Sequence, residues 1–164
     1  MNLIALVDNN WGIGNAGDLL VDIPEDKRLI NEESRGKVLI TGRRSYEAMP
    51  NRFPTLDRKI IVMSKSLKKA ASNVDIAKDL DECMKLIEGV RSEDIYVVGG
   101  AEIFKELMRF CDTADITKVD YDYDADKFLD NLDESADWQL VAESDEHTYF
   151  NVCYTFRKYK RSTD

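Results

Sequence analysis

The sequence contains few of the residues that build metal sites, disulfide frameworks or nucleophilic triads. Its 164 residues include three cysteines and one histidine. Cys83, Cys111 and Cys153 are far apart, odd in number and match no metal-ligand spacing, which favours free thiols in a reducing compartment. His147 lies in a polar stretch, so we expect no histidine-based triad and no metal site. Chemistry must therefore come from carboxylates, backbone groups and a cofactor.

Long hydrophobic runs and an excess of positive charge are also missing. The N-terminal apolar run has no basic lead and stops at Asp8, so we expect neither a signal peptide nor a membrane span, and a cytoplasmic location. The formal net charge is -9, and Lys and Arg are scattered among acids, which argues against nucleic acid as a partner. A small anionic ligand is still compatible with this charge, because the field inside a pocket is local. We expect a monomer with a small-molecule substrate.

Short apolar runs alternate with helical patterns along most of the chain. The runs predict buried parallel strands at residues 3–7, 38–40, 60–63 and 96–98. Helices are predicted between them, at residues 25–33, 45–49, 80–87 and 103–110. Beyond residue 117, two extended stretches predict an antiparallel hairpin, with strands at residues 138–143 and 149–159 joined by residues 144–147.

These patterns indicate an α/β fold in one domain over residues 1–164. We expect a mostly parallel central sheet, an antiparallel C-terminal strand and flanking helices. The connection over residues 9–23 contains Gly12, Gly14 and Gly17, and long loops of this kind often close over ligands. An ordinary flexible surface loop explains the same composition, so both interpretations stay open.

Asp26 is the most informative polar residue. Asp22 as a cap, Pro24 and Glu25 predict that a helix begins just before it. An acid in a first turn often only complements the helix dipole. However, the large apolar residues Leu29 and Ile30 follow three and four positions later, so Asp26 shares the face turned toward the core. Burial penalises a charge, which makes Asp26 either a ligand-binding carboxylate or half of a buried salt bridge.

Two predicted strands are each followed by glycine and then by a helix. The first site has Thr41-Gly42-Arg43-Arg44-Ser45, and the second has Gly99-Gly100-Ala101-Glu102. Glycine lets a ligand approach the backbone, and the following helix start offers free N–H groups to a phosphate. Each site alone is explained by a tight turn, but two together favour a pyrophosphate site. Neither matches the Gly-x-Gly-x-x-Gly pattern of a Rossmann domain.

Ser64 and Lys65 follow the predicted strand at residues 60–63. An NAD-specific Rossmann site more typically has an acid at the corresponding place. A hydroxyl and an ammonium group there favour a 2'-phosphate, although a surface lysine is often merely solvated.

The order of these segments resembles the dihydrofolate reductase family across nearly the whole chain. The resemblance is carried by Leu3-Ile4-Ala5-Leu6, Ile13-Gly14, Ile23-Pro24-Glu25-Asp26, Gly42-Arg43-Arg44-Ser45, Arg58-Lys59-Ile60-Ile61, Val97-Val98-Gly99-Gly100-Ala101-Glu102-Ile103-Phe104 and Ile116-Thr117. Each motif is weak alone, whereas their order and spacing are specific. The resemblance implies the family's mixed sheet and an NADPH-dependent reduction of 7,8-dihydrofolate to tetrahydrofolate.

The resemblance also implies roles for individual residues. Asp26 would accept hydrogen bonds from the pterin ring with support from Thr117, and Arg58 would bind the carboxylate of the folate tail. The apolar lining of the substrate site would be Ile4, Leu6, Leu19, Ile30, Met49 and Val98. The nicotinamide would lie near Ala5, Ile13 and Gly14, and the 2'-phosphate near Ser64 and Lys65. The pyrophosphate and ribose would be held by Gly42, Arg43, Arg44, Ser45, Gly99, Gly100, Ala101, Glu102 and Ile103.

Several positions depart from the family pattern. Leu20-Val21 stands where most members have Pro-Trp, Ile30 replaces a frequent phenylalanine, Phe104 a frequent tyrosine, and Lys27 an apolar residue. These changes are expected to alter the rate, the antifolate affinity or the preferred pterin. Two other functions are compatible with the sequence: a pyrimidine reductase of the riboflavin pathway on the same scaffold, and a non-catalytic nucleotide-binding module.

Overall fold

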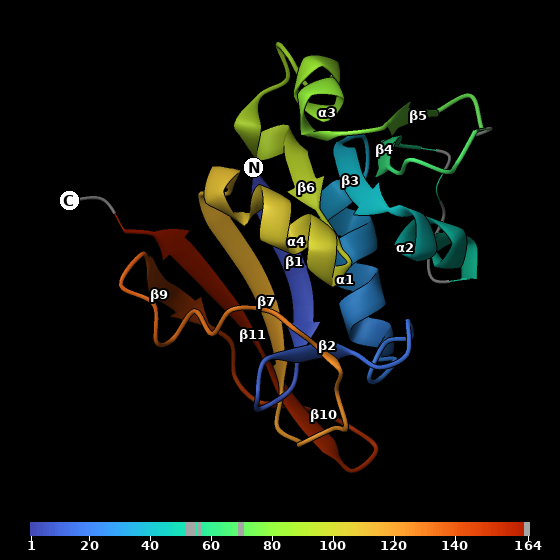
Figure 1. Ribbon diagram of the computed structural model, residues 1–164. Coiled ribbons are helices and arrows are strands. Elements are labelled where there is room, and N and C mark those ends of the chain that lie inside the picture. The colour runs from blue at the N-terminus through green and yellow to red at the C-terminus, as the bar shows by residue number, and fades with distance from the viewer. Residues whose placement is uncertain (52–54, 56, 69–70, 163–164) are drawn as a thin grey trace.

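A computed structural model of the protein describes residues 1–51, 55, 57–68 and 71–162. The described chain forms a central sheet with helices on both faces (Figure 1). In spatial order, the sheet contains β10 (His147–Tyr149), β11 (Val152–Arg161), β7 (Thr113–Val119), β1 (Asn2–Val7), β6 (Ile95–Val97), β3 (Val38–Gly42), β4 (Lys59–Met63) and β5 (Val74–Ala77). The antiparallel strand β9 (Trp138–Glu143) pairs with β11. A separate two-stranded ribbon pairs β2 (Gly12–Gly14) with β8 (Lys127–Phe128).

The strands from β7 to β5 run parallel, and β11 runs antiparallel to β7. The four α-helices of the described residues are α1 (Pro24–Ser34), α2 (Arg43–Ala48), α3 (Leu80–Leu86) and α4 (Ala101–Leu107). Short 3-10 turns cover Met49–Asn51, Ser92–Asp94 and Met108–Phe110. The predicted α/β class, the mostly parallel sheet and the antiparallel C-terminal strand are therefore confirmed.

Strand β1 separates the two main cores of the molecule. Leu3, Ala5 and Val7 pack with α3 and α4 on one face, while Ile4 packs with Ile30 of α1 on the other. This alternation follows from the period of two along a strand. In the described residues, no helix is long and apolar enough to cross a lipid bilayer.

The predicted start of α1 was partly wrong. Pro24 occupies the first turn as expected, but the N-cap is Ile23, and no side chain caps the helix. Asp22 instead pairs with Lys27, whose Nζ lies 3.0 Å from an Asp22 carboxylate oxygen. The capping position lies one residue later than expected, and the Asp22 side chain forms an ion pair with Lys27 in place of a cap.

The hairpin and the fourth helix also needed correction. β9 matches the predicted 138–143 strand, but residues 149–159 are not one strand: β10 ends at Tyr149 and β11 begins at Val152. The α-helix predicted at residues 103–110 begins at Ala101 and ends at Leu107, followed by a 3-10 turn. The parallel strands β5 and β7 were missed. In β7, Asp115 and Lys118 interrupt the apolar pattern.

Two polar contacts join α1 to β7. Near the start of the helix, Asp26 meets Thr117. Two helical turns later, Glu33 faces Asp115 from the same strand, with Lys158 of β11 and Tyr96 of β6 nearby. Burial, together with the neighbouring Asp115 carboxylate, raises the pKa of Glu33 to about 7, although Lys158 opposes the shift. A protonated Glu33 carboxyl can therefore donate a hydrogen bond to Asp115 near neutral pH.

Glu33 is expected to make the free energy of unfolding fall as the pH rises from 4.5, the ordinary Glu pKa, to about 7. In this window the folded protein binds the Glu33 proton more tightly than the unfolded chain, so stability is lost with rising pH. We expect Glu33→Gln to remove about 1 kcal/mol of this pH dependence, since the partly exposed group is screened by solvent. Urea unfolding at about pH 5 and about pH 8 measures the difference. Glu32→Gln is the exposed control, and parallel pH profiles for wild type and Glu33→Gln would contradict the assignment.

Candidate active site

A cleft of about 1300 Å³ runs along the carboxyl ends of the parallel strands. Its walls come from the second half of β1, the ends of β3 and β4, the segment after β6, and the first turns of α2 and α4. Ligands of open α/β sheets bind at this end because successive strands there turn away into helices. The volume exceeds the usual range for one small-molecule pocket, so the cleft has room for two ligands side by side.

Asp26 lies on the wall of this cleft and is 4% exposed. Thr117 Oγ1 donates a 2.7 Å hydrogen bond to Asp26 Oδ1. Ile30 is buried on the same helix face, so the prediction that the carboxylate points inward is confirmed. The neighbouring cations of α1 bind other acids, Lys27 binding Asp22 and Arg28 binding both Glu25 and Glu32.

The walls beside Asp26 are apolar. Ile4, Leu6, Leu19, Ile30, Met49 and Val98 all line the cleft, as expected from the sequence. Leu19 is exposed at the rim, whereas Ile4, Ile30 and Met49 are buried. A flat ring in this part of the cleft would be held by apolar contacts on its faces and by the carboxylate at its edge.

The two glycine turns predicted from the sequence lie against each other. Gly42 N donates to Gly99 O at 2.8 Å, and Thr41 Oγ1 donates to the same carbonyl at 3.1 Å. A methyl group on Gly42 would stand 3.2 Å from Ile103 Cγ1, which is tighter than most such contacts, so Ile103 would have to shift by a few tenths of an ångström. Gly99 has φ +114, a conformation that L side chains rarely adopt, and the Gly99–Gly100 peptide bond is cis. The starts of α2 and α4 therefore form one continuous surface.

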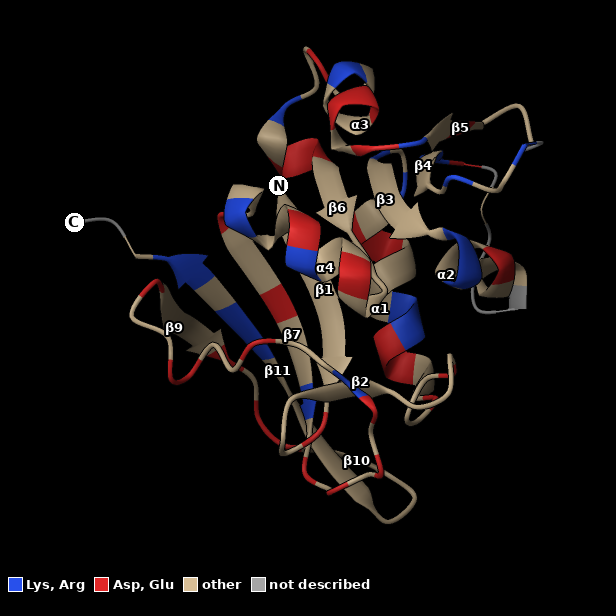
Figure 2. Cartoon of the chain, in the orientation of Figure 1, with Lys and Arg blue, Asp and Glu red and all other residues tan. Residues whose placement is uncertain are grey.

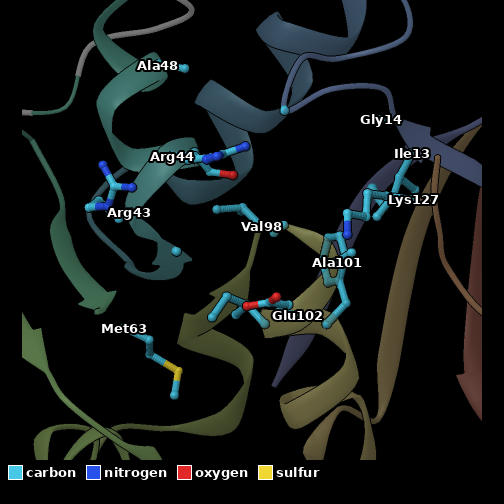
Figure 3. Close-up of a pocket in the computed structure, with 18 of the residues that line it drawn as sticks. Ile13, Gly14, Arg43, Arg44, Ala48, Met63, Val98, Ala101, Glu102 and Lys127 are labelled. Carbon is cyan, nitrogen blue, oxygen red and sulfur yellow. The ribbon is translucent and has the colours of Figure 1, made fainter. Parts of the chain in front are cut away.

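Charged side chains surround this surface (Figure 3). Arg43 and Arg44 reach the cleft from the first turn of α2, and Glu102 reaches it from α4. Lys127 approaches from β8 on the opposite side, beside Ile13. Ser45, Ser64, Lys65, Gly100, Ala101 and Ile103 also line the cleft. All predicted cofactor residues, including Ala5 and Gly14, therefore lie in one cavity.

Arg58 and Thr117 are the two predicted site residues that do not line the cleft. Thr117 lies behind Asp26 and reaches the site through its hydroxyl. Arg58 is buried beside α1, where Nη1 donates to Ser34 Oγ and Nη2 donates to Asn31 Oδ1, each at 2.7 Å. Whether Arg58 contacts a ligand stays a prediction.

Several cleft residues were not found from the sequence. Lys78, Asp79 and Leu80 follow β5, and identifying that strand would have indicated them, because its carboxyl end lies at the same edge of the sheet. Lys127 had no local signal, since only the pairing of β8 with β2 brings it to the cleft. Ala48, Met63 and the loop residues Gly17, Asp18 and Asp22 were also missed, as were Lys105 and Glu106 of α4.

Asp8 fixes the chain on the nicotinamide-side wall predicted at Ile13 and Gly14. Its carboxylate is fully buried; Oδ1 accepts hydrogen bonds from the N–H groups of Asn10 and Gly12 at 2.9 and 2.8 Å. Oδ2 accepts a bond from Tyr123 N at 3.0 Å, so one side chain joins the β1–β2 turn to the loop after β7. The predicted movement of residues 9–23 stays a prediction.

A cleft at the carboxyl ends of parallel strands, with glycine turns along one part and a buried carboxylate in another, is typical of α/β enzymes that bind a nucleotide cofactor beside a substrate. Comparison with known proteins narrows this class. The profile of the dihydrofolate reductase family matches residues 1–161. The chain belongs to the dihydrofolate reductase family.

Individual relatives agree with this membership. The dihydrofolate reductase of Neisseria gonorrhoeae is 28% identical over 160 residues, covering 97% of this chain and 96% of the relative. The type 8 dihydrofolate reductase of Escherichia coli is 31% identical over 131 residues, covering 75% and 74%. A solved structure of the Enterococcus faecalis enzyme, complexed with NADP(H) and RAB-propyl, is similar in fold, with a TM-score of 0.82, 24% identity and coverage of 99% and 96%.

Family membership decides between the functions left open by the sequence. The family reduces dihydrofolate with NADPH, so the chain is an NADPH-dependent oxidoreductase. The riboflavin-pathway reductase and the non-catalytic binding module are not favoured.

Asp8→Asn is expected to lower the free energy of unfolding by about 1 to 3 kcal/mol, because an amide cannot accept all three N–H bonds and leaves a buried donor unsatisfied. Amide hydrogen exchange should accelerate at Gly12 and Tyr123. Asp120→Asn is a suitable control, since Asp120 is exposed and accepts one bond from Asn9. Equal stability and exchange in the two variants would argue against the role of Asp8.

Proposed function

We propose that 7,8-dihydrofolate binds with its pterin ring against Asp26, and that NADPH binds along the two glycine turns with its nicotinamide near Ala5, Ile13 and Gly14. The observation that carries this proposal is the buried Asp26 carboxylate, held by Thr117 on the wall of a cleft large enough for two ligands. The reduction then requires two rings stacked in a cavity from which water is excluded.

Asp26 has two tasks in this proposal. Its carboxylate accepts hydrogen bonds from the amino group and a ring N–H of the pterin, which fixes the orientation of the ring. Its negative charge, in surroundings that are mostly apolar, also favours a proton on the substrate ring and makes the acceptor carbon more electrophilic. Thr117 supports the carboxylate by donating a hydrogen bond to Oδ1.

The described residues fit a dinucleotide phosphate. Gly42, Gly99 and Gly100 line the cleft without side chains, and Arg43, Arg44 and Ser45 supply donors at the start of α2. Ser64 and Lys65, joined by Lys78 at the end of β5, would hold the 2'-phosphate. When bound, NADPH supplies the hydride, and the protein contributes position and electrostatics.

Lys127 and Glu102 would contact other parts of the bound cofactor. Lys127 would neutralise part of the phosphate charge from the β8 side, and Glu102 in the first turn of α4 would accept hydrogen bonds from ribose hydroxyls. Arg58 would bind the carboxylate of the folate tail beyond the far end of α1.

The substitution of Pro-Trp by Leu20-Val21 is expected to slow the reaction. Val21 packs with Leu6, Ile23 and Val119 in a small apolar cluster next to the cleft. Aliphatic packing is therefore retained, but a valine cannot donate a hydrogen bond to a water beside the pterin as an indole can.

The proposal also includes the domain organisation, the oligomeric state, the location and the partners of the protein. We expect one domain over residues 1–164, acting as a monomer in the cytoplasm without nucleic acid. The net charge of -9 supports the last point, and basic residues are interspersed with acidic ones along the chain (Figure 2).

Asp26→Asn should lower kcat/KM for dihydrofolate by about 100- to 1,000-fold, because the amide keeps the shape but loses the charge. NADPH absorbance with dihydrofolate present measures the rate, and a fluorescence titration measures NADPH binding, which is expected to stay within about twofold of wild type. Turnover like that of wild type, or a loss of activity that is explained by a loss of NADPH binding, would contradict the assigned role.

Lys65→Ala should raise KM for NADPH by about tenfold and leave KM for NADH unchanged, because only NADPH carries the 2'-phosphate. Lys68→Ala is the matched control, since Lys68 is exposed in the same segment but does not line the cleft. An equal preference for the two cofactors in wild type and in Lys65→Ala would exclude a 2'-phosphate site at this position.

A further inference from the structure

The guanidinium group of Arg58 is already engaged by a neighbouring carboxylate. Asp57 Oδ1 accepts hydrogen bonds from Arg58 Nε at 2.9 Å and from Nη2 at 2.6 Å. These two nitrogens form one edge of the planar fork, and a carboxylate ligand uses such an edge for a pair of hydrogen bonds. Ser34 and Asn31 accept bonds from Nη1 and Nη2, which fixes the fork against α1.

The two partners differ in their exposure to solvent. The Arg58 side chain is 0% exposed, whereas the Asp57 side chain is 43% exposed. Arg58 donates to Asp57 and lowers the pKa of its carboxyl, so Asp57 is ionised at neutral pH. Arg58 therefore cannot move toward solvent without losing buried contacts, whereas the half-exposed Asp57 has room to turn away into solvent.

A second cation is available to Asp57. Arg35 Nε lies 3.2 Å from Asp57 Oδ2, and the Arg35 side chain is 62% exposed. Asp57 thus bridges a buried guanidinium and an exposed one. If Asp57 released Arg58, it could keep its contact with Arg35, because the two interactions use different carboxylate oxygens.

We infer that Asp57 is a specificity-determining residue that competes with the carboxylate of the folate tail for Arg58. The inference rests on the proposed function, in which Arg58 binds that tail. Binding a tail carboxylate exchanges one ion pair on Arg58 for another, so the affinity gained from the tail is the difference between the two. The protein therefore discriminates less between tailed and tail-less pterins than Arg58 alone would allow, and Arg35 stabilises the displaced Asp57.

The test compares two substrates that differ in the tail: dihydrofolate and 6-methyl-7,8-dihydropterin. Asp57→Asn retains an acceptor for Arg58 but removes the competing charge. We expect the dissociation constant of dihydrofolate, measured by calorimetry, to fall by about three- to tenfold, and that of the methylpterin to change by less than about twofold. Arg35→Ala should change both dissociation constants by less than about twofold, because Asp57 contacts Arg35 both before and after it releases Arg58.

Asp75→Asn is the matched control. Asp75 is an acid of comparable exposure, and its Oδ2 lies 2.7 Å from Nζ of Lys59. Lys59 is the residue that follows Arg58 in the sequence. Its dissociation constants for both ligands should equal those of wild type, and thermal unfolding verifies that all variants are folded.

The outcomes distinguish a failure of the proposed function from a failure of the competition by Asp57. Wild type that binds neither pterin would overturn the proposed function and this inference together. Wild type that binds both, with Asp57→Asn leaving dihydrofolate affinity unchanged or altering both ligands equally, would overturn the competition by Asp57 alone.

Discussion

The contact between Asp26 and Thr117 is the constraint on which the site depends. A carboxylate that is 4% exposed is stable only where hydrogen bonds offset its loss of water. Thr117 supplies one such bond from β7. This strand is held on one side by parallel pairing with β1 and on the other by seven antiparallel residue pairs with β11. The position of the charge therefore depends on the sheet as a whole and on α1, whose buried Ile30 sets the rotation of the helix.

The second constraint is the meeting of two glycine turns at one edge of the sheet. β3 and β6 are neighbours, so the turns that follow them converge, and the bonds from Thr41 and Gly42 to the Gly99 carbonyl lock them together. Among the described residues, the cleft is lined by six basic residues and by six acidic ones: Arg43, Arg44, Lys65, Lys78, Lys105 and Lys127, and Asp18, Asp22, Asp26, Asp79, Glu102 and Glu106. Local field and backbone donors, rather than overall charge, decide what such a cleft binds.

Both ends of α1 are held by polar contacts with other parts of the chain. Asp26 in its first turn meets β7, and Ser34 at its end accepts a hydrogen bond from Arg58. Glu33, which directly precedes Ser34, meets Asp115 of β7. A shift of α1 along the sheet would therefore move Asp26 and disturb the contacts that hold Arg58, so one helix fixes the positions of both groups.

The sequence alone determined the α/β class, the burial of Asp26 and the two glycine turns, because hydrophobic period, helix start signals and strand-glycine-helix order are local properties. It did not reveal β7, whose Asp115 and Thr117 are polar residues satisfied by α1 and β11, nor the Ile23 cap of α1. Lys78 and Lys127 were equally hidden, since β5 and the β2–β8 pairing bring them to the cleft. The tertiary structure alone decided that Asp57 occupies Arg58: adjacent residues of opposite charge need not pair, and here they do because α1 fixes the rest of the guanidinium.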